Sequence, residues 1–374
     1  MKKYKVLHFP IANSRGGITN YALMNWQYIN KDLFQFDFAT LSKTLDFEDE
    51  LRVEGCKVHY LSCYAEENEE KFIEEFLNIL DNDYDIIHLH TSYWKSKLVE
   101  ECAQQRGVPR VIIHAHNTGL WNQQDERIRN ELLKNHNQVK HSLSMQDATD
   151  FWACSQVAAD WLYGQNINQN SIKILNNAIP IDSFIFSKKI RVSYRDNLGF
   201  KQDDFILGHV GRFAYEKNHE FLVEVFYHIQ KSISNAKLLL IGLGPLKESV
   251  MKRVNKLGVQ NKVIFLENRN DVHNLLMVLD VFLLPSFFEG FPISLVEAQT
   301  SGLKCISSDL VTSEAKLTKN IEFLPLDREI WCNRIFTIAK GYERQDMSRE
   351  IRKAGFDITN QIKIVERLYM GDDK

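Results

Sequence analysis

Short apolar runs alternate with amphipathic stretches along the first half of the chain. Apolar residues that recur every three or four positions, such as Phe72, Phe76 and Leu80, predict helices with one buried face. The short runs between them are rich in Val, Ile and Phe and predict buried strands. The pattern places strands at 4–9, 36–41, 58–61, 85–90, 110–114, 150–154 and 172–175, and helices at 18–28, 66–80 and 97–106.

The same alternation returns in the second half of the chain. Strands separated by helices predict parallel sheets, with ligands at the carboxyl ends of the strands. Residues 176–200, with Pro180 and a charged run, predict a linker between two domains. Beyond the linker, strands are expected at 205–212, 237–241, 263–266 and 281–284, and helices at 219–232, 246–257, 271–278, 292–301 and 356–370.

Composition and charge place the chain among ordinary globular proteins. Of its 374 residues, 44% are hydrophobic and 25% are charged, which excludes a disordered or fibrous chain. The net charge of -3 offers no electrostatic surface for nucleic acid. No apolar run is long enough to span a membrane, and the chain begins with a strand pattern where a signal peptide would be apolar, so a cytoplasmic protein is expected. The six cysteines form no Cys-x-x-Cys pair, which argues against a zinc site and a disulfide framework.

Residues 281–302 have the pattern of a strand, a tight loop and a capped helix, which is typical of a ligand site. Pro292 suits the first position of a helix, where a missing N–H costs nothing, and Gly302 suits its end. Glu289 in the loop and Glu297 in the second helical turn are expected at one end and along one flank of the same helix.

Cations precede this stretch in positions that suit a phosphate group. Arg212 follows one strand and Lys217 precedes the next helix, so both can face the helix that begins at Pro292. A helix N-terminus, an Arg fork and a Lys charge are all phosphate-binding components. Glu297 can accept hydrogen bonds from the two hydroxyls of a ribose, and Glu289 from those of a sugar. Together these groups predict a site for a nucleotide-diphosphate sugar.

The first half offers its own candidates at the ends of predicted strands. His116 and Asn117 follow the strand at 110–114, and His90 and His114 compete with His116 for an active-site role. Gly16 and Gly17 stand where a helix begins, and either a ligand or a tight turn explains them. Gly242 belongs to a short Gly-x-Gly pattern, which alone is a weak signature of nucleotide binding. Residues 121–141 are either an acceptor site or a solvated helical face.

The motifs GRFAYEKN, GLGPLKESV, FLLPSFFEGFPISLVEAQTSG, HAHNT and ACSQVAADWLYG resemble the retaining glycosyltransferases of family 4, especially the bacterial enzymes of capsular polysaccharide and exopolysaccharide biosynthesis. The resemblance covers nearly the whole chain. It implies the GT-B fold, in which two Rossmann-like doubly wound α/β domains face each other across a cleft. The domains implied are an acceptor-side domain at 1–185, a donor-side domain at 200–352 and a C-terminal helix at 353–374 that returns to the first domain.

The resemblance also implies a division of labour among the candidate residues. It places Glu297 on the donor ribose, Glu289 on the transferred sugar, and Arg212 and Lys217 on the diphosphate. It makes His116 an active-site residue near the sugar. It further implies backbone contacts to sugar and phosphate from the segment Gly290, Phe291, Pro292 and Ile293, in which Pro292 has no N–H to donate. The remaining residues implied are a donor contact at Gly242, base contacts at Asn268 and Arg269, and a loop at Gly16, Gly17 and Asn117 that faces the phosphates or the acceptor.

The function expected on this basis is metal-independent transfer of a hexose-type sugar, with retention, from a UDP-sugar to a saccharide or a lipid-linked saccharide. No cofactor and no metal ion is expected, since no Asp-x-Asp follows a strand in the second half. Work on a lipid-linked acceptor implies peripheral contact with the inner membrane face. Two alternatives stay open, a nucleotide-sugar 2-epimerase of the same fold and a non-catalytic nucleotide-sugar-binding protein.

Overall fold

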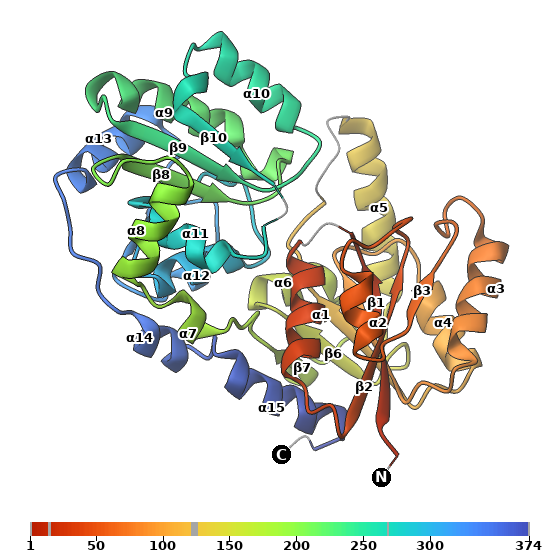
Figure 1. Cartoon of the computed structure of the whole chain (residues 1–374). Coiled ribbons are helices and arrows are strands. Elements are labelled where there is room, and N and C mark those ends of the chain that lie inside the picture. Colours follow the sequence, from red (N-terminus) through yellow and green to blue (C-terminus); the bar gives the residue numbers. More distant parts are fainter. Residues whose placement is uncertain (1, 14–15, 121–125, 268, 373–374) are drawn as a thin grey trace. The chain divides into compact units, whose positions relative to one another are not determined.

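A computed structural model describes residues 2–13, 16–120, 126–267 and 269–372. The chain divides into two compact units, each built around one parallel sheet (Figure 1). Unit 1 comprises Met1–Asn177 and Ile358–Lys374, and unit 2 comprises Ala178–Asp357. In the described part of the chain, no helix combines the length and the apolar character needed to cross a bilayer.

Unit 1 contains a seven-stranded sheet in the order β3-β2-β1-β4-β5-β6-β7. All neighbouring strands pair in parallel. Helices α1 and α15 cover one face and α3 and α4 the other (Figure 1). The strands are β1 (Tyr4–Ile11), β2 (Phe34–Thr40), β3 (Val58–Tyr60), β4 (Ile86–Thr91), β5 (Arg110–Ala115), β6 (Asp150–Ala153) and β7 (Ile172–Ile174), and the helices of the first segment are α1 (Gly17–Tyr28), α2 (Glu48–Val53), α3 (Glu69–Leu80), α4 (Leu98–Gln105), α5 (Glu126–Ser142) and α6 (Gln156–Leu162).

Unit 2 contains a six-stranded parallel sheet in the order β10-β9-β8-β11-β12-β13. Helices α9, α10 and α13 lie on one face and α8, α11 and α12 on the other (Figure 1). The strands are β8 (Phe205–Val210), β9 (Ala236–Ile241), β10 (Val263–Leu266), β11 (Val281–Leu284), β12 (Lys304–Ser308) and β13 (Ile321–Leu324), and the helices are α7 (Ile181–Phe184), α8 (Lys188–Asn197), α9 (His219–Ser232), α10 (Lys247–Lys256), α11 (Val272–Val278), α12 (Ile293–Thr300), α13 (Arg328–Ile338) and α14 (Ser348–Lys353).

Both sheets have the strand order of a Rossmann-like doubly wound fold, which confirms the predicted fold class. In such a sheet the connections leave in opposite directions from two central strands, and the loops at the carboxyl ends of these strands diverge. This switch point lies between β1 and β4 in unit 1 and between β8 and β11 in unit 2. Ligands are therefore expected at the loops that follow these four strands.

The last helix, α15 (Ile358–Tyr369), completes the core of unit 1. Its apolar side chains Ile362, Val365 and Leu368 pack in the same cluster as Trp26 of α1. The Tyr369 hydroxyl lies 2.6 Å from His88 Nδ1 of β4. Residues distant in the sequence thus share one core.

The boundary between the units, at Asn177 and Ala178, falls within the linker predicted at 176–200. Beyond it the linker prediction is wrong, because the segment forms α7 and α8 and belongs to unit 2. The guanidinium of Arg195 is fully buried and donates to the Asp280 carboxylate at 2.8 Å and to the carbonyl oxygens of Val278 and Asp204 at 2.9 Å. A buried cation with this many partners anchors the helix. The charged composition that suggested a linker belongs to an ordered part of the fold.

Candidate functional site in unit 2

Two loops meet at the switch point of unit 2. The first follows β8 and includes a short 3-10 turn, Tyr215–Lys217, and the second joins β11 to α12. The backbone N–H of Phe287 donates to the Glu216 carbonyl at 2.8 Å, and the rings of Tyr215 and Phe287 stack at 5.0 Å. One backbone hydrogen bond and one aromatic pair therefore hold the loops in register.

A charged cluster lies where these loops meet. Lys217 Nζ donates to Glu289 Oε1 at 2.5 Å, and Ser286 Oγ donates to the same oxygen at 2.6 Å. The side chains of Lys217 and Glu289 are 16% and 11% exposed, and Ser286 is fully buried. Their low exposure strengthens the interaction between the two charges, and the exposed part of each side chain can still contact a ligand. An anion can take the place of Glu289 beside Lys217, and sugar hydroxyls can donate to the Glu289 carboxylate.

Ser286 was not predicted as a site residue. It stands three positions before Glu289 and its hydroxyl fixes the position of one carboxylate oxygen. A serine between a strand and a loop glutamate is a weak signal in the sequence, because most such hydroxyls cap turns or face water.

Glycines allow the neighbouring loop to approach the first one. A Cβ on Gly242 would lie 2.1 Å from the Gly211 carbonyl oxygen, and a Cβ on Gly244 would lie 2.4 Å from the Phe213 carbonyl oxygen. Both glycines also have a positive φ, of 149° and 156°. The Gly-x-Gly pattern is thus explained by backbone packing at the carboxyl ends of β8 and β9.

The N-terminus of α12 points its first N–H groups toward the same loop end. The helix begins at Ile293, so Pro292 is its N-cap and the prediction that Pro292 occupies the first helical position is off by one. Among the residues that the structure describes, no side chain makes a capping hydrogen bond at this end, and the first turn contains no acidic residue. Backbone donors and a positive dipole end suit an anion here.

Glu297 lies in the second turn of α12 and is half-buried. Within the described residues, no hydrogen bond is made to its carboxyl group, and burial raises the pKa of Glu297 to about 8. A carboxyl group without a cation nearby is costly to ionise. Hydroxyl donors from a ligand would supply the missing stabilisation of its charged form.

The remaining residues predicted to contact the donor, Arg212, Arg269 and Asn268, do not share one environment. Arg212 is exposed at the carboxyl end of β8. Arg269 is held by Asp271, to which its Nε and Nη2 donate at 2.7 and 2.5 Å. Asn268, the other predicted base contact, lies outside the described residues. The structure therefore brings Lys217 and Glu289 together, whereas Arg269 is engaged in an ion pair of its own.

The histidine array in unit 1

Five histidines line one face of the unit 1 sheet, on or directly after β1, β4 and β5. The rings of four of them, His88, His90, His114 and His116, lie against Tyr21 of α1. Parallel pairing aligns His8 with His88 and His90 with His114, which brings alternate positions of three strands together. We call these residues the histidine array: His8, His88, His90, His114 and His116. All are between 0% and 8% exposed.

Hydrogen bonds divide the array into two chains. In the first, His8 Nδ1 lies 3.0 Å from His90 Nε2, and His90 Nδ1 lies 3.0 Å from His116 Nε2. In the second, Tyr369 bonds to His88 Nδ1 and His88 Nε2 lies 3.0 Å from His114 Nδ1. Burial lowers the pKa of every ring in the array, so all are neutral at physiological pH.

Three of these rings also have the composition of a metal site. Ligand atoms of His88, His90 and His114 lie within 4.8 Å of one another. Neutral imidazoles are good ligands for zinc and copper. However, these rings already use nitrogen atoms in hydrogen bonds with other members of the array. A metal ion would have to displace those bonds, so the hydrogen-bonded arrangement fits the donor set better.

Among the histidines considered from the sequence, His116 is the most exposed, at 8%, against 3% for His90 and 0% for His114. It follows the carboxyl end of β5, and its backbone N–H donates to the Thr91 carbonyl at 3.1 Å. Asn117, next to it, is half-buried. His8 and His88 were missed, although the strand pattern repeats His at alternate positions in neighbouring strands.

The other candidates in unit 1 lie at helix surfaces. Gly16 caps α1 with a φ of -79° and Gly17 begins it, and both are exposed. Among the described residues, a Cβ on Gly17 would touch nothing within 4 Å.

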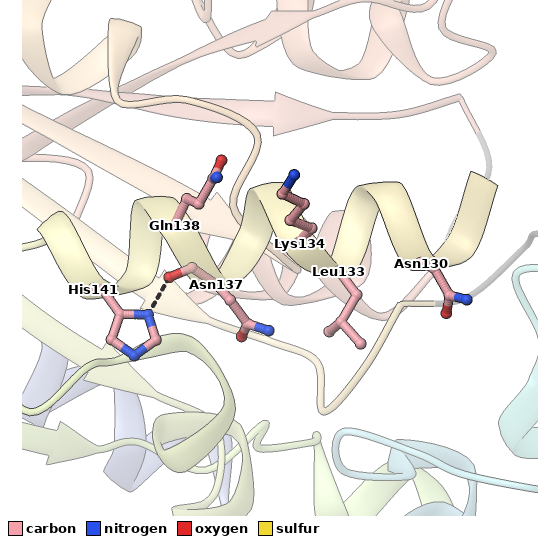
Figure 2. A pocket seen from close by; sticks show the side chains of 6 residues that line it. All are labelled: Asn130, Leu133, Lys134, Asn137, Gln138 and His141. Atoms are coloured by element: carbon pink, nitrogen blue, oxygen red, sulfur yellow. Dashed lines mark hydrogen bonds between the residues drawn. The ribbon is translucent and has the colours of Figure 1, made fainter. Parts of the chain in front are cut away.

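Helix α5 carries the predicted acceptor region, of which residues 121–125 lie outside the described part of the chain. A hollow of about 740 Å³ runs along its surface (Figure 2). Among the described residues of α5 only His136 is buried, which fits a solvated face. The side chains that line the hollow all come from this helix: Asn130, Leu133, Lys134, Asn137, Gln138 and His141.

Comparison with known proteins

Each unit matches its own family of sequences. Residues 16–178 match the family described as Glycosyl transferase 4-like domain, and residues 191–324 match the family described as Glycosyl transferases group 1. The first match falls in unit 1, and the second falls in unit 2 and contains both Lys217 and Glu289.

Two relatives span most of the chain. EpsF of Bacillus subtilis, named as a glycosyltransferase, is 30% identical over 83% of this chain and 80% of its own length. The UDP-Gal:alpha-D-GlcNAc-diphosphoundecaprenol alpha-1,3-galactosyltransferase of Escherichia coli is 22% identical over 98% of this chain and 97% of its own length.

The fold is similar to that of solved structures as well. HepE of Anabaena in complex with UDP and glucose has a TM-score of 0.75 and 15% sequence identity, and the match covers 98% of this chain and all of that one. The identity to EpsF over most of both chains establishes the family, and the alternatives of an epimerase and a binding protein are not what these relatives are named for. The chain belongs to the GT-B glycosyltransferases of family 4 and is a transferase.

Proposed function

We propose that the protein transfers a hexose-type sugar from a UDP-sugar to a lipid-linked saccharide, with retention and without a metal ion, in the biosynthesis of a bacterial polysaccharide. The observation that carries this proposal is the convergence of Lys217, Glu289 and Ser286 beside the N-terminus of α12. A cation, a fixed carboxylate and a helix N-terminus match the diphosphate and the sugar of such a donor.

The donor would bind to unit 2 in three parts. The ribose hydroxyls donate to Glu297, which stabilises the ionised carboxylate. The diphosphate takes hydrogen bonds from the first turn of α12, from Lys217 and from Arg212. Once the diphosphate pairs with Lys217, Glu289 can accept hydrogen bonds from the sugar hydroxyls while Ser286 continues to hold Oε1.

Catalysis in this proposal is mainly electrostatic. The bond between the anomeric carbon and the phosphate oxygen breaks, and the bond to the acceptor oxygen forms on the same face of the ring. The departing phosphate takes the proton of the acceptor hydroxyl, so atoms and charge balance. Lys217, Arg212 and the helix dipole stabilise the negative charge that grows on the leaving group, and such preorganised groups can lower a barrier by about 3–4 kcal/mol each.

The choice of substrates rests on relatives. HepE was solved with UDP and glucose, and the E. coli relative is named for UDP-Gal and a diphosphoundecaprenol acceptor. These names favour uracil as the base and a lipid-linked saccharide as the acceptor. An acceptor with a polyprenyl anchor would bring the enzyme to the inner membrane face.

The test starts with donor binding. UDP-glucose, UDP-galactose, GDP-mannose and ADP-glucose are compared by thermal shift, since a ligand that binds the folded state raises the melting temperature. The UDP-sugar with the largest shift is then incubated with lipid-linked saccharides and the products are analysed for a new glycosidic bond and its anomeric configuration. Release of a free epimer, an inverted product or no turnover with any acceptor would contradict the proposal. Unchanged donor affinity in Glu297→Ala would contradict the ribose contact.

A further inference from the structure

The chain passes from unit 1 to unit 2 after Asn177 and returns to unit 1 after Asp357. We call these two points the first and the second crossover. Within unit 2, the segments beside them pair as a short parallel bridge between Ile179 and Asp357. In this bridge the backbone N–H of Ile179 donates to the Phe356 carbonyl at 2.9 Å. One backbone hydrogen bond therefore joins the two crossovers.

Helix α12, whose N-terminus belongs to the candidate site, packs against the two helices that flank the crossovers. It contacts α7, which follows the first crossover, and α14, which precedes the second. Arg352 of α14 forms ion pairs with Asp182 of α7 and with Asp357. All of these contacts lie within unit 2. The helix of the donor site and the segments that hold the crossovers together therefore form one packed group.

One aromatic pair joins the loop before α12 directly to the second crossover. The rings of Phe291 and Phe356 stack with their centroids 5.1 Å apart and their planes at 23°. Both side chains are buried, with 8% of Phe291 and 3% of Phe356 exposed. Phe291 stands two positions before Ile293, the first residue of α12, and Phe356 provides the carbonyl that joins the crossovers. A displacement of Phe356 therefore removes a packing partner of the donor loop.

We propose that Phe291 and Phe356 link the donor site to the crossovers, so that a nucleotide diphosphate bound at the N-terminus of α12 stabilises the paired crossovers. This inference rests on the proposed function, which places the diphosphate at that helix end. The N–H groups of the loop and the first turn bind the diphosphate in the conformation that Phe356 supports, so the nucleotide binds the paired state more tightly than the unpaired one. The linkage is reciprocal, because the factor by which the nucleotide favours pairing is the factor by which pairing raises the affinity for the nucleotide.

Hydrogen exchange at Ile179 reports the pairing, because its amide donates the bond that joins the crossovers. Exchange is followed by mass spectrometry in overlapping peptides that include Ile179, with and without saturating UDP, and peptides of β13 provide the reference for general stabilisation. Calorimetric titrations give the Kd of UDP. In the wild type, UDP should slow exchange at Ile179 about fivefold or more relative to the reference, a factor typical of coupled sites. In Phe356→Leu this protection should be lost and the Kd of UDP should rise about fivefold, because the two effects are reciprocal.

Phe221→Leu is the matched control, because it makes the same substitution in another aromatic pair of unit 2, in which Phe221 contacts Trp331. It should leave the Kd of UDP and the protection of Ile179 unchanged. Arg352→Gln is the second variant, because it removes the ion pairs that hold the crossovers and leaves the aromatic pair intact. Exchange at Ile179 without UDP should then be faster, whereas UDP should still slow it by the same factor as in the wild type.

Three results would overturn the linkage alone: UDP that binds to the wild type without slowing exchange at Ile179, equal losses in Phe356→Leu and Phe221→Leu, or loss of the UDP effect in Arg352→Gln. The thermal shift with UDP is measured on every variant, and its midpoint without UDP shows whether the variant is folded. A wild type that does not bind UDP would refute the proposed donor site and, with it, the linkage.

Discussion

The charged cluster of unit 2 and the histidine array of unit 1 both lie near the switch point of a parallel sheet, but they differ in charge and in burial. In unit 2, Lys217 and Glu289 come from loops and keep partly exposed charges. In unit 1, the polar groups come from the strands themselves, between the sheet and α1, where they are buried and neutral. A charge inside the helix-sheet layer would have to be fully desolvated, whereas a charge on the loop rim is not.

The difference indicates which unit can bind an anion. The rim of unit 2 offers an ammonium group and helix N–H donors to a diphosphate. The array offers single N–H groups and lone pairs, which suit neutral hydroxyls. One fold thus provides an anion site or a hydroxyl site according to whether its polar residues follow the strands or lie within them.

The largest expected difference between the regions is their response to acid. Burial lowers the pKa of seven histidines in unit 1 and four in unit 2: His8, His59, His88, His90, His114, His116 and His136, and His209, His219, His228 and His273. Because the unfolded chain titrates near pH 6.5, it binds more protons than the folded unit below that pH, and folding stability falls as the pH falls. Each buried ring contributes up to about 1.4 kcal/mol per pH unit.

Unit 1 should therefore unfold at a higher pH than unit 2. Hydrogen exchange followed by mass spectrometry between about pH 7.5 and pH 5 resolves the two units by their peptides. Loss of protection in peptides of β4 and β5 before those of β8 and β11 is the expected result. Simultaneous loss in both units would show that the array does not set the acid sensitivity.

The second largest effect is expected at Lys217, in the charged cluster of unit 2. Lys217→Ala should lower kcat/KM about 10²- to 10³-fold, because the proposed function assigns to this half-buried cation the stabilisation of the leaving group. Lys262→Ala is the control: Lys262 precedes β10 at the amino end of the sheet and bonds to Gln230 and Ser234. Steady-state kinetics with the preferred UDP-sugar measure both. Similar losses in the two variants would remove Lys217 from the leaving-group role.

A smaller effect separates the sugar contact from the phosphate contact. Ser286→Ala removes a hydrogen bond to a charged carboxylate, which costs about 1.5–3 kcal/mol, or about 10- to 100-fold. In the proposed function Glu289 accepts hydrogen bonds from the sugar, so kcat and UDP-sugar affinity should fall while the affinity for UDP stays constant in calorimetric titrations. Ser301→Ala, which removes another fully buried serine hydroxyl, from the C-cap of α12, is the control. A parallel loss of UDP affinity would mean that Ser286 supports the whole loop.

The strands and helices were predictable where apolar periodicity decides them. The bounds of α9, β10 and β11 agree with the prediction to the residue. The error at 176–200 has a physical cause: Arg195 is polar in the sequence, but carbonyl oxygens and Asp280 satisfy it inside the fold. Residues 303–352 were not assigned, although they provide β12 and β13 at the edge of the unit 2 sheet.

The sequence pattern predicted which residue types belong to the candidate site, but it did not predict which of these residues contact one another. Strand ends and a helix start pointed to Lys217 and Glu289 separately, but their ion pair joins positions 72 apart and depends on the strand order. The array depends on register in the same way, since His8 and His88 become neighbours only when β1 pairs with β4. Long-range pairing of this kind is fixed by packing of the whole sheet and not by local periodicity.

The smallest expected effect concerns Glu297. This residue is an exception to the contrast between the two units, because it is a half-buried acid without a paired charge among the described residues of unit 2. Burial raises its pKa to about 8, so at pH 7 most of the carboxyl groups are protonated and the ionised form appears as the pH rises through 8. If the ribose hydroxyls donate to the ionised form, affinity for the UDP-sugar should rise by up to about tenfold between pH 7 and pH 9. Glu297→Gln should bind with an affinity that does not change over this range. Calorimetric titrations of both proteins at each pH provide the measurement, and a pH dependence that persists in Glu297→Gln would place the titrating group elsewhere.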